Sequence, residues 1–181
     1  MCFQTGVGVV PLPDFRTEGK RVFFTSAMGT GDLSSWAAAQ SREGIDAGDA
    51  VCQAAARDAG FDNADRYKAW LSTAVIEARD RVTSDGPWVR IDGSKVAEKL
   101  GTTDIVNSIS QNENGDYGEV RVWTGTNSDG SRNAESCDNW NNGTNVFRGL
   151  HGISTTVNVS WSQTSPSGTC DTVRHLYCFE D

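Results

Sequence analysis

The sequence has few of the residues that metal sites and membrane spans require. Its 181 residues include only two histidines, His151 and His175, and none of the five cysteines forms a Cys-x-x-Cys pair. A zinc site built from clustered His and Cys is therefore not expected. No apolar run approaches the roughly 20 residues that a membrane-spanning helix needs, so no transmembrane segment is expected either.

Positive charge is also scarce. The chain has 16 Lys and Arg against 24 Asp and Glu, which gives a net charge of −8. The basic residues are spread along the chain from Arg16 to Arg174 rather than clustered. A negative surface repels phosphate backbones and sulfated polymers, so nucleic acid and heparin are not expected partners.

The motifs of common hydrolases are missing as well. Neither histidine is accompanied by a Gly-x-Ser-x-Gly motif, and we do not expect an enzyme. A pair of acids that cleaves polysaccharide stays open as an alternative, because folding rather than sequence spacing brings two carboxylates together.

The cysteines are the first informative feature. Four of them, Cys52, Cys137, Cys170 and Cys178, lie in the patterned part of the chain and suggest two disulfides and an oxidising compartment. Four cysteines permit three pairings. Cys2 is left over, either as an unpaired thiol or as the lipid-attachment site of an exported bacterial protein. The start "MCFQTG" has no charged and apolar signal region, so we expect an export signal to be removed or to lie outside these residues.

Local patterns predict short strands mixed with two helices, which is an α+β protein, with an irregular arm over 1–20 and one domain over 21–181. A helix over 49–60 begins at a capping Asp49 and ends at Gly60, with Cys52 on its buried face. A second helix is expected over 74–82. A hairpin over 88–97 turns at Asp92-Gly93, a type I′ pair. The remaining strands are expected over 21–27, 67–72, 120–126 and 175–181.

The segment 127–170 has little regular pattern and is rich in Asn, Ser, Gly and Thr. Loops of this length are often functional. Side chains that would contact a ligand are Asn127, Asp129, Asp138, Asn139, Asn141 and Trp161. A set of oxygen ligands for calcium is also available: Asn127, Asp129, Glu135, Asp138 and Asn139. "TNSDG" (126–130) matches part of a calcium loop but lacks its first acid and distal glutamate, and it suits a β-turn equally.

Five strings in order resemble a known family: "CQAAARDAG", "YKAWLS", "RIDGSKV", "VWTGTNSDGSRNAESCDNW" and "CDTVRHLYCFED". They are similar to endostatin, and more closely to the bacterial endostatin-like domains of leptospiral surface lipoproteins and other exported proteins, over about residues 22–180. The resemblance implies a C-type lectin-like fold, with a mixed, mostly antiparallel sheet, two short helices and a long disulfide-closed loop. It also implies nested disulfides, Cys52 with Cys178 and Cys137 with Cys170, and places Trp123 and Trp140 in the core.

The function that the resemblance implies is a secreted or surface-displayed, non-enzymatic adhesion module that contacts an extracellular protein or glycan through loop 127–170. A calcium-dependent carbohydrate-binding lectin is the alternative, although the Glu-Pro-Asn and Gln-Pro-Asp triplets of such lectins are missing from the sequence. The N-terminal histidines of the zinc site in endostatin and its basic arginine face are not matched here, so neither property is carried over.

Overall fold

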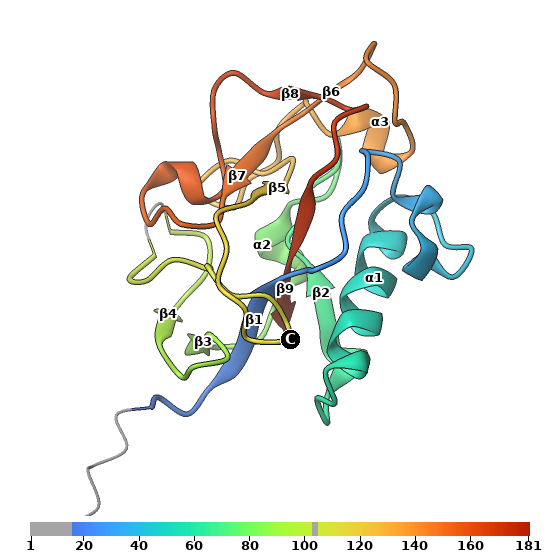
Figure 1. Ribbon diagram of the computed structural model, residues 1–181. Helices are drawn as coiled ribbons and strands as arrows, with labels where there is room; N and C mark the ends of the chain where they lie inside the picture. The colour runs from blue at the N-terminus through green and yellow to red at the C-terminus, as the bar shows by residue number, and fades with distance from the viewer. Residues whose placement is uncertain (1–15, 103–104) are drawn as a thin grey trace, which may run out of the picture.

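The computed structural model describes residues 16–102 and 105–181, and its centre is the last strand, β9 (His175–Glu180) (Figure 1). One edge of β9 pairs antiparallel with β1 (Lys20–Phe24). Its other edge pairs antiparallel with β2 (Tyr67–Ala69) and then parallel with β5 (Arg121–Trp123). Most of the protein is therefore arranged around its final residues.

Further strands extend the sheet on both sides. Beyond β1 lie β3 (Trp88–Val89) and β4 (Lys95–Ala97), and beyond β5 lies β7 (His151–Ile153). A separate small sheet joins β6 (Arg148–Gly149) to β8 (Gly168–Thr169). The α-helices are α1 (Gly44–Asp58), α2 (Ala78–Arg81) and α3 (Cys137–Trp140), and the 3₁₀ turns are η1 (Leu33–Ser35), η2 (Ala37–Ala39), η3 (Ala64–Arg66) and η4 (Val159–Trp161). The predicted α+β class with a mixed, mostly antiparallel sheet is confirmed.

The two faces of β9 are both buried. Side chains alternate along a strand, so Leu176 and Cys178 face the core beneath α1, whereas Tyr177 and Phe179 face a second core that contains Trp70 and Trp161. This explains why "LYCF" is apolar without interruption. None of the helices in the described ranges is long and apolar enough to cross a membrane.

Helix α1 begins earlier than its sequence pattern predicts. Asp49 is not its cap but lies inside the helix, where its carboxylate accepts the Ala69 N–H. The end of the helix is as predicted: Gly60 adopts φ = 76°, its N–H bonds to the Arg57 carbonyl, and the next N–H, of Phe61, bonds to Ala56. These two hydrogen bonds form the Schellman motif, which favours glycine because of the positive φ.

Both disulfides have the nested pairing that the resemblance implies. Cys52–Cys178 joins α1 to β9 across a sequence separation of 126, and Cys137–Cys170 joins α3 to the end of the long loop across 33. All four cysteines are buried. Trp123 and Trp140 are also buried, with ring centroids 6.1 Å apart, as expected.

Two local predictions are corrected. The hairpin of β3 and β4 turns through a three-residue loop rather than a type I′ pair: the Gly93 N–H bonds to Arg90 C=O, the Arg90 N–H bonds to Ser94 C=O, and the positive φ lies at Gly93 (83°). The helix predicted over 74–82 shrinks to α2, because the Thr73 hydroxyl accepts the Val75 and Ile76 N–H groups and holds a turn there.

The long loop is more regular than its composition suggests, because it contains α3, β6, β7, η4 and β8. Its strands are too short to show periodicity. Most of the predicted arm 1–20 lies outside the described residues, together with Cys2 and the lipid attachment considered for it. Inside the described part, the Thr17 N–H bonds to the Gly93 carbonyl, and β1 begins at Lys20.

Candidate functional site

Loop 127–170 forms the upper part of the molecule and is held at several points (Figure 1). The Cys137–Cys170 disulfide and the β6–β8 pair close it on itself. A bridge between Ser136 and Gly149 also lies within the loop, and a bridge between Asp32 and Asn141 attaches it to the segment before α1. The backbone of the loop is therefore held in one conformation by these contacts.

The segment "CDNW" is a left-handed turn. Cys137, Asp138, Asn139 and Trp140 have φ of 50°, 55°, 57° and 68°. Such a conformation costs roughly 1–2 kcal/mol per residue, least for Asn and Asp. The disulfide of Cys137 holds the turn at one end, and the Trp140 Nε1–H, which donates to Ser72 C=O at 2.8 Å, holds it at the other. This segment therefore stabilises the fold. Its Asp-Asn pair was the only sequence signal for a left-handed turn.

The residues predicted to bind calcium are used for internal contacts. Asp129 accepts hydrogen bonds from the Ser131 hydroxyl and N–H, which lower its pKa. The Gly130 N–H bonds to Asn127 C=O, so "TNSDG" is the β-turn that was the alternative interpretation. Glu135 pairs with Arg148 at 3.5 Å, and Asn139 Oδ1 accepts the Ala74 N–H at 2.8 Å.

The acids of that set do not converge. Within 16–102 and 105–181 no group of three or more His, Cys, Asp or Glu side chains is placed to hold a metal ion, so Asp129, Glu135 and Asp138 do not form one. These acids lie within ten positions of each other in the sequence, but the fold does not group their carboxylates. The three acids of the calcium set are therefore not assembled as predicted.

Trp161 is corrected as a ligand-contacting residue. It is 1% exposed, and its ring packs against Trp70 with centroids 5.4 Å apart and against Tyr177 at 6.0 Å. Trp161 therefore belongs to the core below the loop. Among the other predicted contact residues, Asp129, Asp138 and Asn141 are exposed, whereas Asn127 and Asn139 are partly buried.

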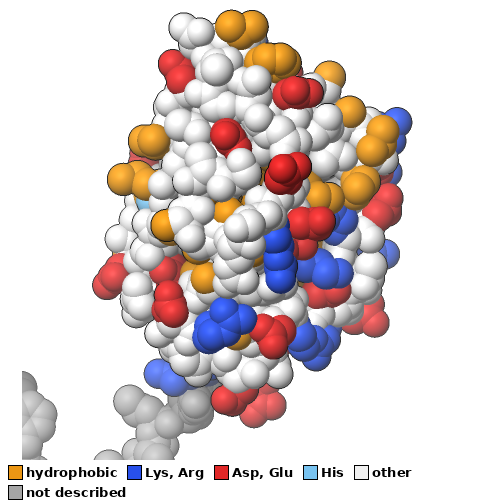
Figure 2. Space-filling view, turned by 90° about the vertical axis from the view of Figure 1, so that its right-hand side faces the viewer, with side chains coloured by type: hydrophobic (Ala, Val, Ile, Leu, Met, Phe, Trp, Pro, Cys, Tyr) orange, Lys and Arg blue, Asp and Glu red, His pale blue; other side chains and the backbone are white. Residues whose placement is uncertain are grey.

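The most accessible part of the loop is the segment 141–148, between α3 and β6, which we call the loop tip. Val146 is 80% exposed and Phe147 is 38% exposed. Figure 2 shows hydrophobic side chains at the top of the molecule, the end at which Figure 1 places α3 and β6. Exposed apolar side chains on a supported loop are typical of a binding surface.

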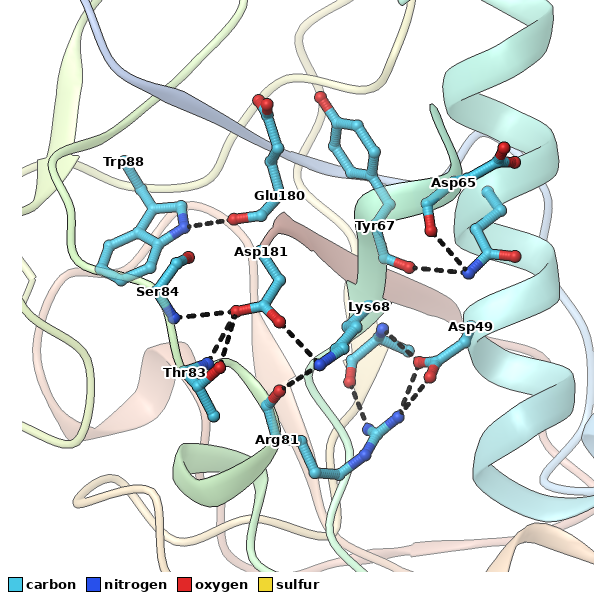
Figure 3. Close-up of polar contacts among 12 residues, drawn as sticks. Asp49, Asp65, Tyr67, Lys68, Arg81, Thr83, Ser84, Trp88, Glu180 and Asp181 are labelled. Atoms are coloured by element: carbon cyan, nitrogen blue, oxygen red, sulfur yellow. Dashed lines mark hydrogen bonds and ion pairs between the residues drawn. The ribbon is translucent and has the colours of Figure 1, made fainter. Parts of the chain in front are cut away.

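A cluster of polar side chains lies where α1, β2 and α2 meet (Figure 3). The Asp49 carboxylate binds the Arg81 guanidinium through two contacts of 2.7 Å, and Arg81 also donates to the carbonyls of Ala69 and Leu71. Burial raises the pKa of Asp49, and the charge and hydrogen bonds of Arg81 act against that rise. Because each charge in this cluster has a counter-charge, the cluster stabilises the packing of α1, β2 and α2.

Asp181 completes the cluster. Its carboxylate accepts hydrogen bonds from Lys68 Nζ at 2.6 Å and from the N–H groups of Thr83 and Ser84 at 2.7 and 2.8 Å. Burial acts to raise its pKa, but these hydrogen bonds outweigh it and lower the pKa to about 2. Lys68 also donates to Arg81 C=O, so Asp181 connects the last strand to α2.

The Asp181 contacts predict a pH dependence. Its folded-state pKa of about 2 lies below its ordinary value of 3.8, so its ionised form stabilises the protein above about pH 4, and this contribution is lost as the pH falls towards 2. Asp181→Asn is expected to lower the free energy of unfolding by about 2 kcal/mol at pH 6. Urea unfolding at pH values from 6 to 3 should show the gap between wild type and variant narrowing. A gap that stays constant with pH would contradict the prediction, and Asp65→Asn on the exposed surface is the control.

Comparison with known proteins does not assign this chain to a family: no protein-family model matches it, and a search of curated proteins finds no significant relative.

Proposed function

We propose that this protein is an exported, non-enzymatic binding module with an endostatin-like form of the C-type lectin-like fold. In this proposal, loop 127–170 recognises an extracellular protein or glycan. Support for the fold comes from the five ordered strings, the nested disulfides and the central last strand. The two disulfides indicate a non-cytosolic compartment, and surface display is part of the proposal.

The observation that carries the function is the loop tip. Val146 and Phe147 are presented to solvent between α3, which is fixed by the Cys137–Cys170 disulfide, and β6, which is paired with β8. Because the neighbouring backbone is already ordered, a ligand would bind without a large cost in loop entropy. Aromatic side chains are enriched in the cores of binding surfaces, and burial of an exposed valine adds the favourable free energy of removing apolar surface from water.

The test is binding of the purified protein to arrays of matrix proteins, serum proteins and glycans. Val146→Ser and Phe147→Ala should each weaken binding to any captured target by at least about tenfold, because each removes a central apolar contact. Val106→Ser is the matched control: Val106 is 62% exposed and its N–H bonds to Val96 of β4, which lies far from the loop tip in Figure 1, so its replacement should leave binding unchanged.

Chelation separates this proposal from the lectin alternative. Binding should be unaffected by EDTA, because the carboxylates of the predicted calcium set are not grouped in the described structure. Loss of binding in EDTA with recovery in calcium would favour the lectin. Equal binding by wild type and both tip variants would refute the assignment of the loop tip.

A further inference from the structure

A pocket of about 460 Å³ lies beside the loop tip, between β5, β7 and the segment 160–168. Its lining includes the guanidinium groups of Arg121 and Arg174 and the imidazole of His151. The hydroxyl groups of Ser160 and Ser165 lie around them, whereas the Thr164 hydroxyl donates to the His151 carbonyl. None of these residues was identified from the sequence as part of a site.

The two arginines are brought together by strand pairing. β5 and β9 run parallel with Val122 opposite His175, so the residues that precede these, Arg121 and Arg174, lie side by side at the same end. Two neighbouring positive charges repel each other, and the charge of Arg121 contributes to the lowered pKa of Arg174. A chain with net charge −8 thus concentrates positive charge at one point.

Arg174 is the most unusual of these groups. It is 6% exposed, and its guanidinium lies 4.7 Å from the ring centroid of Trp123. Its Nε is buried without a hydrogen-bond partner among the described residues, and no acid in this part of the chain forms an ion pair with Arg174 or Arg121. Burial and the Arg121 charge lower its pKa to about 10, so it remains a cation at neutral pH. A buried cation without a counter-charge is costly, which indicates that it is retained to bind one.

His151 holds the second arginine. Its Nε2 lies 2.9 Å from Arg121 Nη1, and since a guanidinium only donates, Nε2 is the acceptor and the ring is neutral. Burial, then the charges of Arg174 and Arg121, lower the pKa of His151 to about 4, so the ring stays neutral through the physiological range. His151 is a positioning residue for Arg121. Gly168 also lines the pocket and lies close to Arg174, because a Cβ at this position would clash with Arg174 Nη2.

We propose that this pocket binds an oxyanion, the carboxylate, sulfate or phosphate group of an acidic ligand. Guanidinium groups bind such oxygens through paired, charge-assisted hydrogen bonds, and two of them with neighbouring hydroxyls supply the required donors. The inference rests on the proposed function only for the identity of the ligand that carries the group. Anion binding itself follows from the pocket.

The experiment titrates the purified, oxidised protein with sodium sulfate, sodium phosphate and sodium acetate, with sodium chloride keeping the ionic strength constant. Isothermal titration and thermal unfolding are the measurements. At least one anion should bind saturably with a dissociation constant on the order of 1 mM and, at 100 mM, raise Tm by about 5 °C. Stronger binding of sulfate or phosphate indicates a tetrahedral ligand group, and stronger binding of acetate indicates a carboxylate.

Variants make the assignment specific. Arg174→Met should abolish the anion-dependent rise in Tm, and Arg121→Gln, at an exposed position that can change without loss of folding, should weaken binding by at least about tenfold. Arg42→Gln, which removes the same charge from another exposed position, should bind like wild type. No saturable binding by any of the three anions, or equal weakening by Arg42→Gln and Arg121→Gln, overturns the proposal. Failure of the loop-tip variants on protein and glycan arrays would refute the proposed function alone, because inorganic anions need no macromolecular ligand.

Discussion

Replacing Cys52 and Cys178 together by Ala is expected to lower the free energy of unfolding by about 5 kcal/mol in the chain-entropy model, because the bond closes a segment of 126 residues. Single domains are stable by only about 5–15 kcal/mol, so this loss is a large part of the total. The bond also joins α1 to the central strand of the sheet, β9. Its removal therefore frees the unfolded chain more than removal of the Cys137–Cys170 bond does.

The inner disulfide is the matched comparison. Cys137→Ala with Cys170→Ala opens a segment of only 33 residues, and the same relation predicts a loss of about 4 kcal/mol. Urea unfolding of the two double variants, each fully oxidised at its remaining pair, measures the difference. We also expect the inner variant to lose the ordered loop first, because the left-handed turn of α3 depends on Cys137. An outer variant as stable as wild type would refute the role assigned to Cys52–Cys178.

Arg81→Met is expected to destabilise the protein by about 3–5 kcal/mol, the loss typical of breaking a buried ion pair on one side. Arg81 and Asp49 are both largely buried, and the substitution leaves the Asp49 carboxylate with the Ala69 N–H as its remaining described partner. The carbonyls of Ala69 and Leu71 lose a donor at the same time. The cost comes mainly from the unpaired charge, so the pKa of Asp49 should rise further.

A double-mutant cycle tests this explanation. Asp49→Asn combined with Arg81→Met should be less destabilised than the sum of the single variants, because no isolated charge then remains buried. The exposed pair of Arg57 and Asp65, also 2.7 Å apart, is the control, and Arg57→Met should cost less than about 1 kcal/mol. Equal losses for Arg81→Met and Arg57→Met in urea unfolding would contradict the burial argument.

Local structure was well predicted at the end of α1 and at β9, where the signal lies in neighbouring residues. The end of α1 at Gly60 depends on a glycine with positive φ at the right position, and the strand β9 on an unbroken apolar run, so both could be predicted from the sequence. The predicted start of α1 was wrong because Asp49 has the residue type of a helix cap. Its carboxylate instead accepts hydrogen bonds from Ala69 and Arg81, which belong to other elements. A side chain that satisfies a distant group gives no local pattern.

The candidate site was predicted only in outline. The sequence predicted a functional surface in loop 127–170. The acids of the loop and Trp161 were predicted to bind calcium or contact a ligand, because residue types alone suggested calcium and sugar chemistry. Trp161 is buried by packing against Trp70, and the three acids of the calcium set are not grouped in the described structure. Of the loop tip only Asn141 was predicted, since Val146 and Phe147 carry no motif.

By itself, the sequence determined the α+β class, the number of disulfides, the helix end at Gly60 and the identity of the last strand, because each depends on composition or on residues that are near neighbours. Only the tertiary structure decided that Arg121 and Arg174 share one pocket, since the sequence shows them as two members of an evenly spread set of basic residues. The parallel register of β5 and β9 makes them adjacent, and the packing of Arg174 over Trp123 buries its charge. Contacts between residues far apart in the chain, and the desolvation that accompanies them, follow from the fold as a whole.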